Sequence, residues 1–259
     1  MIMITNLLVG GLGNQLFQIS AGYTVAKIMK TDYVINYKIV GGPGQGKQPL
    51  IYKNNLYSKI LETEKENWYL YNQKGFNYQK LPRRDNMCLC GYFQSEKFFL
   101  QCKNEIKNLF FFPESIKKDV DNQMSKFKNK IVGVHIRRGD YKKEIHKTIH
   151  PIQSIDYIMK AKSFFNHSEV DFILFTDDFE TVSKEINISD FHLLKNSSEI
   201  HDLYALSQCD SIIMANSSFS WWGSYLGKKK EKVIAPKLWF GKDGPYPYDD
   251  IYIDDWIII

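Results

Sequence analysis

The ten residues from Ile131 to Asp140, IVGVHIRRGD, constrain the fold more than any other stretch of this chain. Five of the first six are β-branched or glycine, which is typical of a short strand buried on both faces of a parallel sheet. The strand then runs directly into charge, with His135, Arg137 and Arg138 preceding Asp140. Ligands of open α/β sheets bind beyond the carboxyl ends of the strands. We therefore expect a functional site at the end of this strand.

The two adjacent arginines are suited to an anionic ligand. A guanidinium group binds phosphate oxygens through two parallel hydrogen bonds and keeps its charge at every physiological pH. Arg137 and Arg138 are therefore predicted to clamp a phosphorylated ligand. The alternative is a surface salt bridge between one of them and Asp140, which an isolated Arg-Arg-x-Asp would favour.

Composition limits the class of protein. With 259 residues and 44% apolar content, the chain can form one large domain or two small ones, and we place a boundary between residues 1–125 and 126–259. The 34 basic and 29 acidic side chains leave too small an excess of positive charge to indicate nucleic-acid binding. This balance suits anionic small molecules or an anionic membrane surface.

Cysteine spacing and hydropathy predict a cytoplasmic protein, with peripheral contact at the inner membrane as an alternative. Cys88, Cys90, Cys102 and Cys209 show no C-x-x-C spacing, so we expect neither a disulfide framework nor a zinc site. The first residues are apolar but lack the basic region and cleavage site of a signal peptide. The sequence contains no run of about 18 apolar residues, so we expect no ordinary transmembrane anchor.

The N-terminal segment predicts a strand over residues 2–9, a glycine loop over 10–15 and an amphipathic helix after it. The loop is similar to a dinucleotide fingerprint, but Leu16 stands where close helix packing requires glycine or alanine. The functional interpretation is narrower: Gly13 lets a ligand approach the backbone, and the amides of Asn14 and Gln15 face the site. Helix capping by Asn14 is the alternative.

The second half predicts alternating strands and helices, which together form a parallel sheet with helices on both faces. The first half is less regular, and residues 50–86 are predicted only as mixed helix and loop. The expected strands are residues 33–36, 88–93, 131–136, 170–176, 191–194, 211–215 and 232–235, and the expected helices are 96–109, 115–127, one opened by Pro151, 179–186, 199–208 with an Asn196–Glu199 capping box, and 221–226.

Three of these strands end in polar residues, and parallel strands place their carboxyl ends on one edge of the sheet. Arg137 follows the first, Asp177 and Asp178 follow the second, and residues 216–220 follow the third. In the third loop, Ser217 and Ser218 present backbone N–H groups at a helix start, which favours a phosphate. Capping of that helix by Ser218 or Ser220 is the alternative.

Asp177 and Asp178 also raise the question of a metal ion. Two adjacent aspartates with no third carboxylate nearby make a poor cation site, so we expect no metal. Hydrogen bonding to a ribose or a base, or capping of the helix that starts at Phe179, is the better interpretation.

Taken together, four motifs resemble those of the bacterial α-1,2-fucosyltransferases of glycosyltransferase family 11, in family order along most of the chain. They are GGLGNQLFQ at residues 10–18, HIRRGD at 135–140, FTDD at 175–178 and SSFSWW at 217–222.

The resemblance implies a GT-B-like α/β architecture, in which two Rossmann-like halves with parallel sheets face each other across a cleft. It also implies an inverting, metal-independent enzyme without cofactors that moves L-fucose from GDP-β-L-fucose to the 2-hydroxyl of a galactose. The acceptor would be a galactose-terminated glycan or a lipid-linked oligosaccharide. Alternatives are another fucosyl linkage such as α-1,6, another nucleotide sugar, or a non-catalytic nucleotide- or sugar-binding module.

Ten residues are expected to take part in the site. The resemblance implies that Arg137 and Arg138 hold the donor diphosphate. Asp140, by its proximity, and Asn14, as a residue that orients the acceptor hydroxyl, are the further catalytic candidates, and each also has a structural interpretation. The donor-binding set is Gly13, His135, Asp177, Ser217, Ser218 and Phe219. The general base is left open between Asp140 and Glu144.

Overall fold

The computed structural model describes residues 2–39, 46–142, 147–195 and 198–259. The chain packs as two compact units. The first unit is Met1–Pro113 with Tyr246–Ile253, and the second is Glu114–Pro245 with Asp254–Ile259. The division into residues 1–125 and 126–259 stays a prediction about folding domains.

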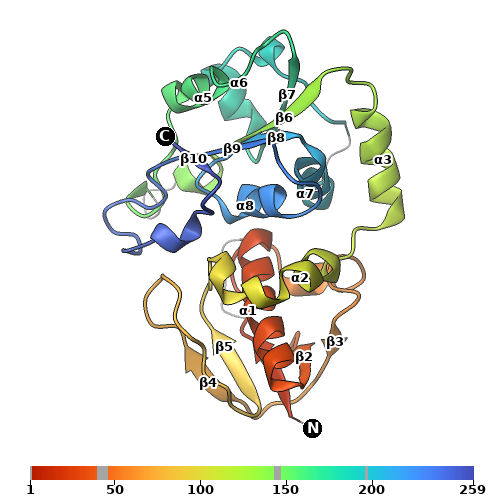
Figure 1. The fold of residues 1–259 in the computed structure, drawn as a ribbon, viewed down its shortest axis with the longest axis vertical. Helices are drawn as coiled ribbons and strands as arrows, with labels where there is room; N and C mark the ends of the chain where they lie inside the picture. The colour runs from red at the N-terminus through yellow and green to blue at the C-terminus, as the bar shows by residue number, and fades with distance from the viewer. Residues whose placement is uncertain (1, 40–45, 143–146, 196–197) are drawn as a thin grey trace. The chain divides into compact units, whose positions relative to one another are not determined.

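The described residues of the first unit form a five-stranded parallel sheet with the order β3-β2-β1-β5-β4. Its longest helix, α1, follows β1 and contacts both β1 and β2 (Figure 1). The elements are β1 (Met3–Asn6), α1 (Leu12–Met29), β2 (Asp32–Ile35), β3 (Leu61–Glu62), β4 (Tyr69–Asn72), β5 (Met87–Cys90) and α2 (Lys103–Leu109).

Buried polar side chains fix the loop between β1 and α1. Gly10 has a φ of 79°, a left-handed conformation that favours glycine, and Gly11 is the N-cap of α1. The Gln18 amide accepts from the Val9 N–H at 3.0 Å and donates to the Val9 carbonyl at 3.2 Å. Since Gln18 is fully buried, these two bonds satisfy its amide and hold the loop against the helix.

The second unit has its own parallel sheet among the described residues, with the order β10-β9-β8-β6-β7. Strand β6 therefore lies between β8 and β7. The elements are α3 (Glu114–Met124), β6 (Lys130–Ile136), α5 (Ile155–Lys162), β7 (Val170–Thr176), α6 (Phe179–Glu185), α7 (Glu199–Gln208), β8 (Ser211–Ile213), α8 (Ser218–Tyr225), β9 (Lys232–Ala235) and β10 (Ile257–Ile258).

Helices cover both faces of this second sheet, with α5 and α6 on one side and α7 and α8 on the other (Figure 1). Val132, Val134 and Ile136 pack in one apolar cluster with residues of α5 and α6. Because side chains alternate along a strand, Gly133 and His135 point to the opposite face. A Cβ placed on Gly133 would lie 2.9 Å from Leu206 of α7, so β6 approaches that helix closely.

The structure confirms the expected α/β fold with two Rossmann-like halves and parallel sheets. Several local predictions were wrong. Residues 50–86 contain β3 and β4, and β4 escaped recognition because it is an edge strand exposed on both faces. The predicted helix over 96–109 is regular only in α2, and its first part forms two 3-10 turns.

Other helix ends also differ from prediction. Helix α5 begins at Ile155 behind the Ser154 cap, four residues after Pro151. Helix α8 begins at Ser218 and not at Trp221, which places two predicted site residues in its first turn. The predicted strand at 191–194 reduces to one isolated bridge at His192. The predicted Asn196 cap of α7 lies outside the described residues.

Replacing Gly133 with alanine is expected to destabilise the second unit. The added methyl group would press on Leu206 at 2.9 Å and on Cys209 Sγ at 3.0 Å. Overpacking of this kind costs about 1–3 kcal/mol. The loss of unfolding free energy is measured by urea unfolding with tryptophan fluorescence as the readout. This readout reports on the second unit, because four of the five tryptophans lie there. An unfolding free energy equal to that of the exposed control Lys184→Ala would contradict this packing.

Candidate active site

Three loops converge at the carboxyl edge of the second sheet. They follow β7, β6 and β8, which are neighbours in that order. The parallel register pairs Ile136 with Thr176, so the residues that follow them emerge side by side. The predicted convergence of the HIRRGD, TDD and NSSFS segments is therefore a property of the fold.

Arg137 lies between two carboxylates at this edge. Its Nη2 donates to Asp140 Oδ1 at 2.6 Å, and its Nη1 lies 3.0 Å from Asp177 Oδ2. Burial lowers the pKa of Arg137, but the charges of Asp177 and Asp140 outweigh it, so the pKa is raised above its ordinary value. The side chain is 28% exposed. Arg137 is thus a fixed, permanent cation with a solvent-accessible side.

Arg138 occupies a different environment, because its side chain is only 3% exposed. Its Nε and Nη2 both contact Glu185 Oε2 at 2.7 Å, and its Nη1 donates to the Arg137 carbonyl at 3.1 Å. Its backbone N–H donates to Asp177 Oδ1 at 2.9 Å. The paired-arginine clamp stays a prediction, and the geometry favours Arg137 as the group that meets an incoming anion.

The two aspartates after β7 serve different purposes. Asp177 binds Arg137 and the Arg138 backbone, as described above. Asp178 is the N-cap of α6: it accepts from the Thr181 N–H at 3.1 Å and pairs with Lys142 at 2.5 Å. Hydrogen bonds from Lys142 and Thr181 lower the pKa of Asp178 to about 2. Both carboxylates are therefore engaged by protein groups, and the expected capping at Phe179 is confirmed.

His135 is buried on the α8 side of β6, with its ring 5.6 Å from the ring of Phe219. Burial, with a smaller contribution from Arg137, lowers its pKa to about 3. Its Nδ1 has no hydrogen-bond partner among the described residues. His135 is thus a neutral imidazole with one unused polar atom.

The loop after β8 leads directly into α8. Ser217 is the N-cap, and its Oγ accepts from the Phe219 N–H at 3.3 Å. Capping by Ser218 or Ser220, the alternative considered above, is therefore wrong. Tyr141 fixes this loop to the first one, because its hydroxyl donates to the Asn216 carbonyl at 2.9 Å. Burial raises the pKa of Tyr141, which keeps the phenol protonated as a donor.

Gly13 and Asn14 belong to the first unit. Both lie within the first turn of α1, where Gly13 is buried and Asn14 is half-buried. Since Gly11 is the N-cap, the capping role considered for Asn14 is wrong. The Asn14 Oδ1 instead accepts from Gln94 Nε2 at 2.6 Å, which fixes the orientation of its amide.

Tyr141, Glu185 and Gln94 are among the residues of these networks that were not singled out from the sequence. Tyr141 directly follows the HIRRGD motif, so its position offered a signal. Glu185 lies 47 residues from Arg138 and Gln94 lies 80 residues from Asn14. Such pairings depend on tertiary packing and leave no local pattern.

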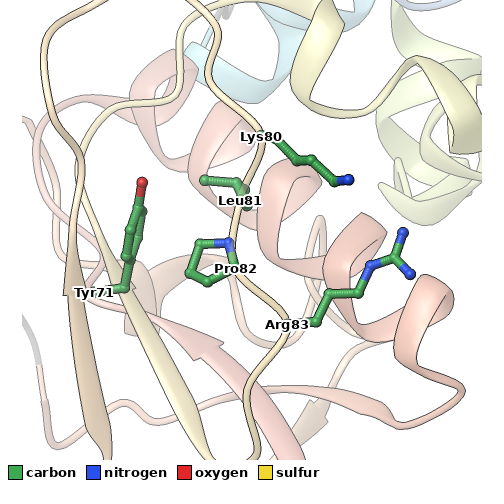
Figure 2. Close-up of a pocket in the computed structure, with 5 residues that line it drawn as sticks. All are labelled: Tyr71, Lys80, Leu81, Pro82 and Arg83. Atoms are coloured by element: carbon green, nitrogen blue, oxygen red, sulfur yellow. The ribbon is translucent and has the colours of Figure 1, made fainter.

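A separate shallow cavity of about 480 Å³ opens on the first unit. Figure 2 shows Lys80 and Arg83 pointing to one side of the segment that contains Leu81 and Pro82, with Tyr71 on the other side. None of the ten predicted site residues lines this cavity.

The described residues contain no cluster of three or more histidine, cysteine or carboxylate side chains arranged to hold a metal ion. None of the described helices combines the length and the apolarity needed to cross a bilayer.

Parallel sheets in both units, with polar side chains at the carboxyl ends of the strands of the second, are typical of α/β proteins that bind a ligand at this edge. Residues 47–259 match the family described as Glycosyl transferase family 11. The chain belongs to this family and is a glycosyltransferase.

The relatives and solved structures agree with the family. An Escherichia coli α-1,2-colitosyltransferase is 27% identical, with 96% of each chain covered. A galactoside 2-α-L-fucosyltransferase of Caenorhabditis elegans is 28% identical, over 89% of this chain and 71% of the relative. Among solved structures, the fucosyltransferase NodZ from Bradyrhizobium superposes with a TM-score of 0.60 at 16% identity, over 95% and 96% of the two chains. The GT-B-like fold of the fucosyltransferases is thereby confirmed.

The buried His135 predicts a specific pH dependence of stability. Between pH of about 6.5 and about 3, the His135 imidazole binds a proton in the unfolded protein but not in the folded one. The unfolding free energy therefore falls as the pH is lowered through this range. His135→Gln lacks this pH-dependent contribution. The difference in unfolding free energy between the wild type and His135→Gln should therefore narrow towards acidic pH. Urea titrations at several pH values measure the difference. A pH-independent difference would show that His135 is not held neutral.

Proposed function

We propose that the protein is an inverting, metal-independent α-1,2-fucosyltransferase. In this reaction L-fucose moves from GDP-β-L-fucose to the 2-hydroxyl of a galactose, and GDP leaves. Membership of family 11 supports the proposal. The names of the two relatives, an α-1,2-colitosyltransferase and a galactoside 2-α-L-fucosyltransferase, support the linkage. A NodZ crystal soaked with GDP-fucose lends weight to the donor.

The observation that carries the mechanism is the fixed and partly exposed guanidinium of Arg137 at the end of β6. Breaking the bond between fucose and phosphate leaves negative charge on GDP. A cation already held in place stabilises that charge without reorganisation at the moment of reaction. We assign this task to Arg137, assisted by backbone N–H groups at the N-terminus of α8 beside Ser217 and Ser218.

The remaining expected residues fit supporting roles in this proposal. Asp140 holds Arg137, since its Oδ1 is already engaged by that guanidinium. His135 offers its unused Nδ1, and Phe219 its ring, to the nucleotide. In the first unit, Gln94 orients the amide of Asn14, and the roles expected for Asn14 and Gly13 stay predictions.

The proposed acceptor is a galactose-terminated glycan, either free or carried on a lipid. The galactoside named for the Caenorhabditis elegans relative supports this choice. We further propose a cytoplasmic location, with contact at an anionic membrane surface restricted to handling of a lipid-linked acceptor.

A second candidate function is transfer of colitose with the same linkage. It is favoured by the full-length similarity to the α-1,2-colitosyltransferase. The two candidate reactions form the same α-1,2 linkage and differ in the sugar that is transferred.

Incubation with GDP-fucose or GDP-colitose and a panel of galactosides tests both candidates. Analysis of the product by NMR locates the new bond. We expect fucose on the galactose 2-hydroxyl with an α configuration. Colitose transfer alone would favour the second candidate, and an α-1,6 bond or the absence of transfer would contradict both.

Arg137→Ala is expected to lower kcat by about 10²-fold or more, the usual effect of losing one group that stabilises developing charge. The initial rate of GDP release measures it. Lys184→Ala is the matched control, because Lys184 is an exposed cation that pairs only with Glu180 of the same helix among the described residues. Turnover in Arg137→Ala equal to that of the control would remove Arg137 from the mechanism.

Full activity is expected after dialysis against EDTA, because the proposed mechanism neutralises the leaving group with protein cations and dipoles. The measurement is the transfer rate with and without added Mg²⁺ or Mn²⁺. Loss of activity in EDTA that either ion restores would show that the leaving group needs a metal.

A further inference from the structure

Glu185 lies at the C-terminal end of α6 and has no place in the motifs or in the reaction as proposed. Its Oε2 receives both Nε and Nη2 of Arg138 at 2.7 Å. The Glu185 side chain is 33% exposed, whereas the Arg138 side chain is 3% exposed. Glu185 therefore compensates a guanidinium that has almost no contact with water.

A short series of contacts connects Glu185 with Arg137. Arg138 is anchored to α6 by Glu185, and its backbone N–H holds Asp177 Oδ1 at 2.9 Å. The other oxygen of Asp177 pairs with Arg137 Nη1 at 3.0 Å. Gly139 leaves room for this arrangement, because a Cβ there would overlap Asp177 Oδ2. The position of Arg137 thus depends on how firmly Arg138 is seated.

We propose that Glu185 is a positioning residue of the donor site, which acts through Arg138, and that the Arg138 guanidinium does not touch the diphosphate. This inference rests on the proposed function, in which Arg137 meets the diphosphate. The two adjacent arginines then have separate tasks. Arg137 contacts the ligand, and Arg138 ties the loop after β6 to helix α6.

The energetics of buried charge support this division. Removing one partner of such a pair leaves an uncompensated charge, whereas replacing both partners with apolar side chains is often tolerated. Glu185→Gln leaves the Arg138 cation without its counter-charge in a buried place. The loop after β6 should then shift to hydrate the cation, and Asp177 and Arg137 should move with it.

The test uses GDP binding by isothermal titration calorimetry on the full chain, at a temperature where circular dichroism shows every variant folded. Glu185→Gln is expected to weaken GDP binding by about tenfold, a usual size for an indirect effect. Glu180→Gln, a change of an exposed carboxylate on the same helix, is the matched control and should bind as the wild type does. Lower thermal stability of Glu185→Gln with unchanged GDP affinity would show a purely structural role and overturn the proposal.

The double variant Arg138→Met/Glu185→Gln separates the two tasks. Methionine fills a similar space without charge. Adding Arg138→Met to Glu185→Gln is therefore expected to restore part of the GDP affinity that Glu185→Gln alone loses. Arg138→Met alone should bind GDP more tightly than Arg137→Met. If Arg138→Met weakens binding further in the Glu185→Gln background, the Arg138 guanidinium itself serves the ligand and the proposal is wrong.

The same titrations distinguish failure of this inference from failure of the proposed function. Wild-type protein without affinity for GDP would overturn the proposed function, and the inference with it. Wild-type binding that Arg137→Met abolishes and Glu185→Gln leaves unchanged would overturn the inference alone.

Discussion

The ion pairs that hold Arg137 between Asp140 and Asp177 are the interaction on which the donor site depends. A guanidinium on a free side chain samples many rotamers, and ordering it when a ligand binds costs entropy. Here the two carboxylates order it in advance. The arrangement also has a cost in charge, because the ligand must share a cation that two anions already neutralise. The five N–H donors of arginine make such sharing feasible.

The sheet of the second unit makes this arrangement possible. Asp140 belongs to the same loop as Arg137, but Asp177 follows a different strand, and only the parallel register of β6 with β7 brings it within 3.0 Å. Tyr141 connects the third loop through the Asn216 carbonyl. The loops after β7 and β8 are therefore each held by at least one hydrogen bond from the loop after β6. The site is built on strand ends, which move less than free loops.

The sequence predicted the sheet edge well, because a run of β-branched residues followed by charge is a local pattern. It also predicted that Arg137 and Asp177 lie close together, since parallel strands end at the same edge of the sheet. It did not reveal that Arg138 is buried or that Glu185 neutralises it, because that pairing depends on how α6 packs on the sheet. Strand β4 was missed for a related reason: exposed on both faces, it has no apolar alternation to read.

A crystal structure of the protein with bound GDP tests the central claim most directly. We expect the phosphate oxygens at hydrogen-bonding distance, about 3 Å, from the Arg137 guanidinium. Arg138 should remain paired with Glu185 in that complex. Phosphates bound out of reach of Arg137, or held by Arg138 after its separation from Glu185, would contradict the account.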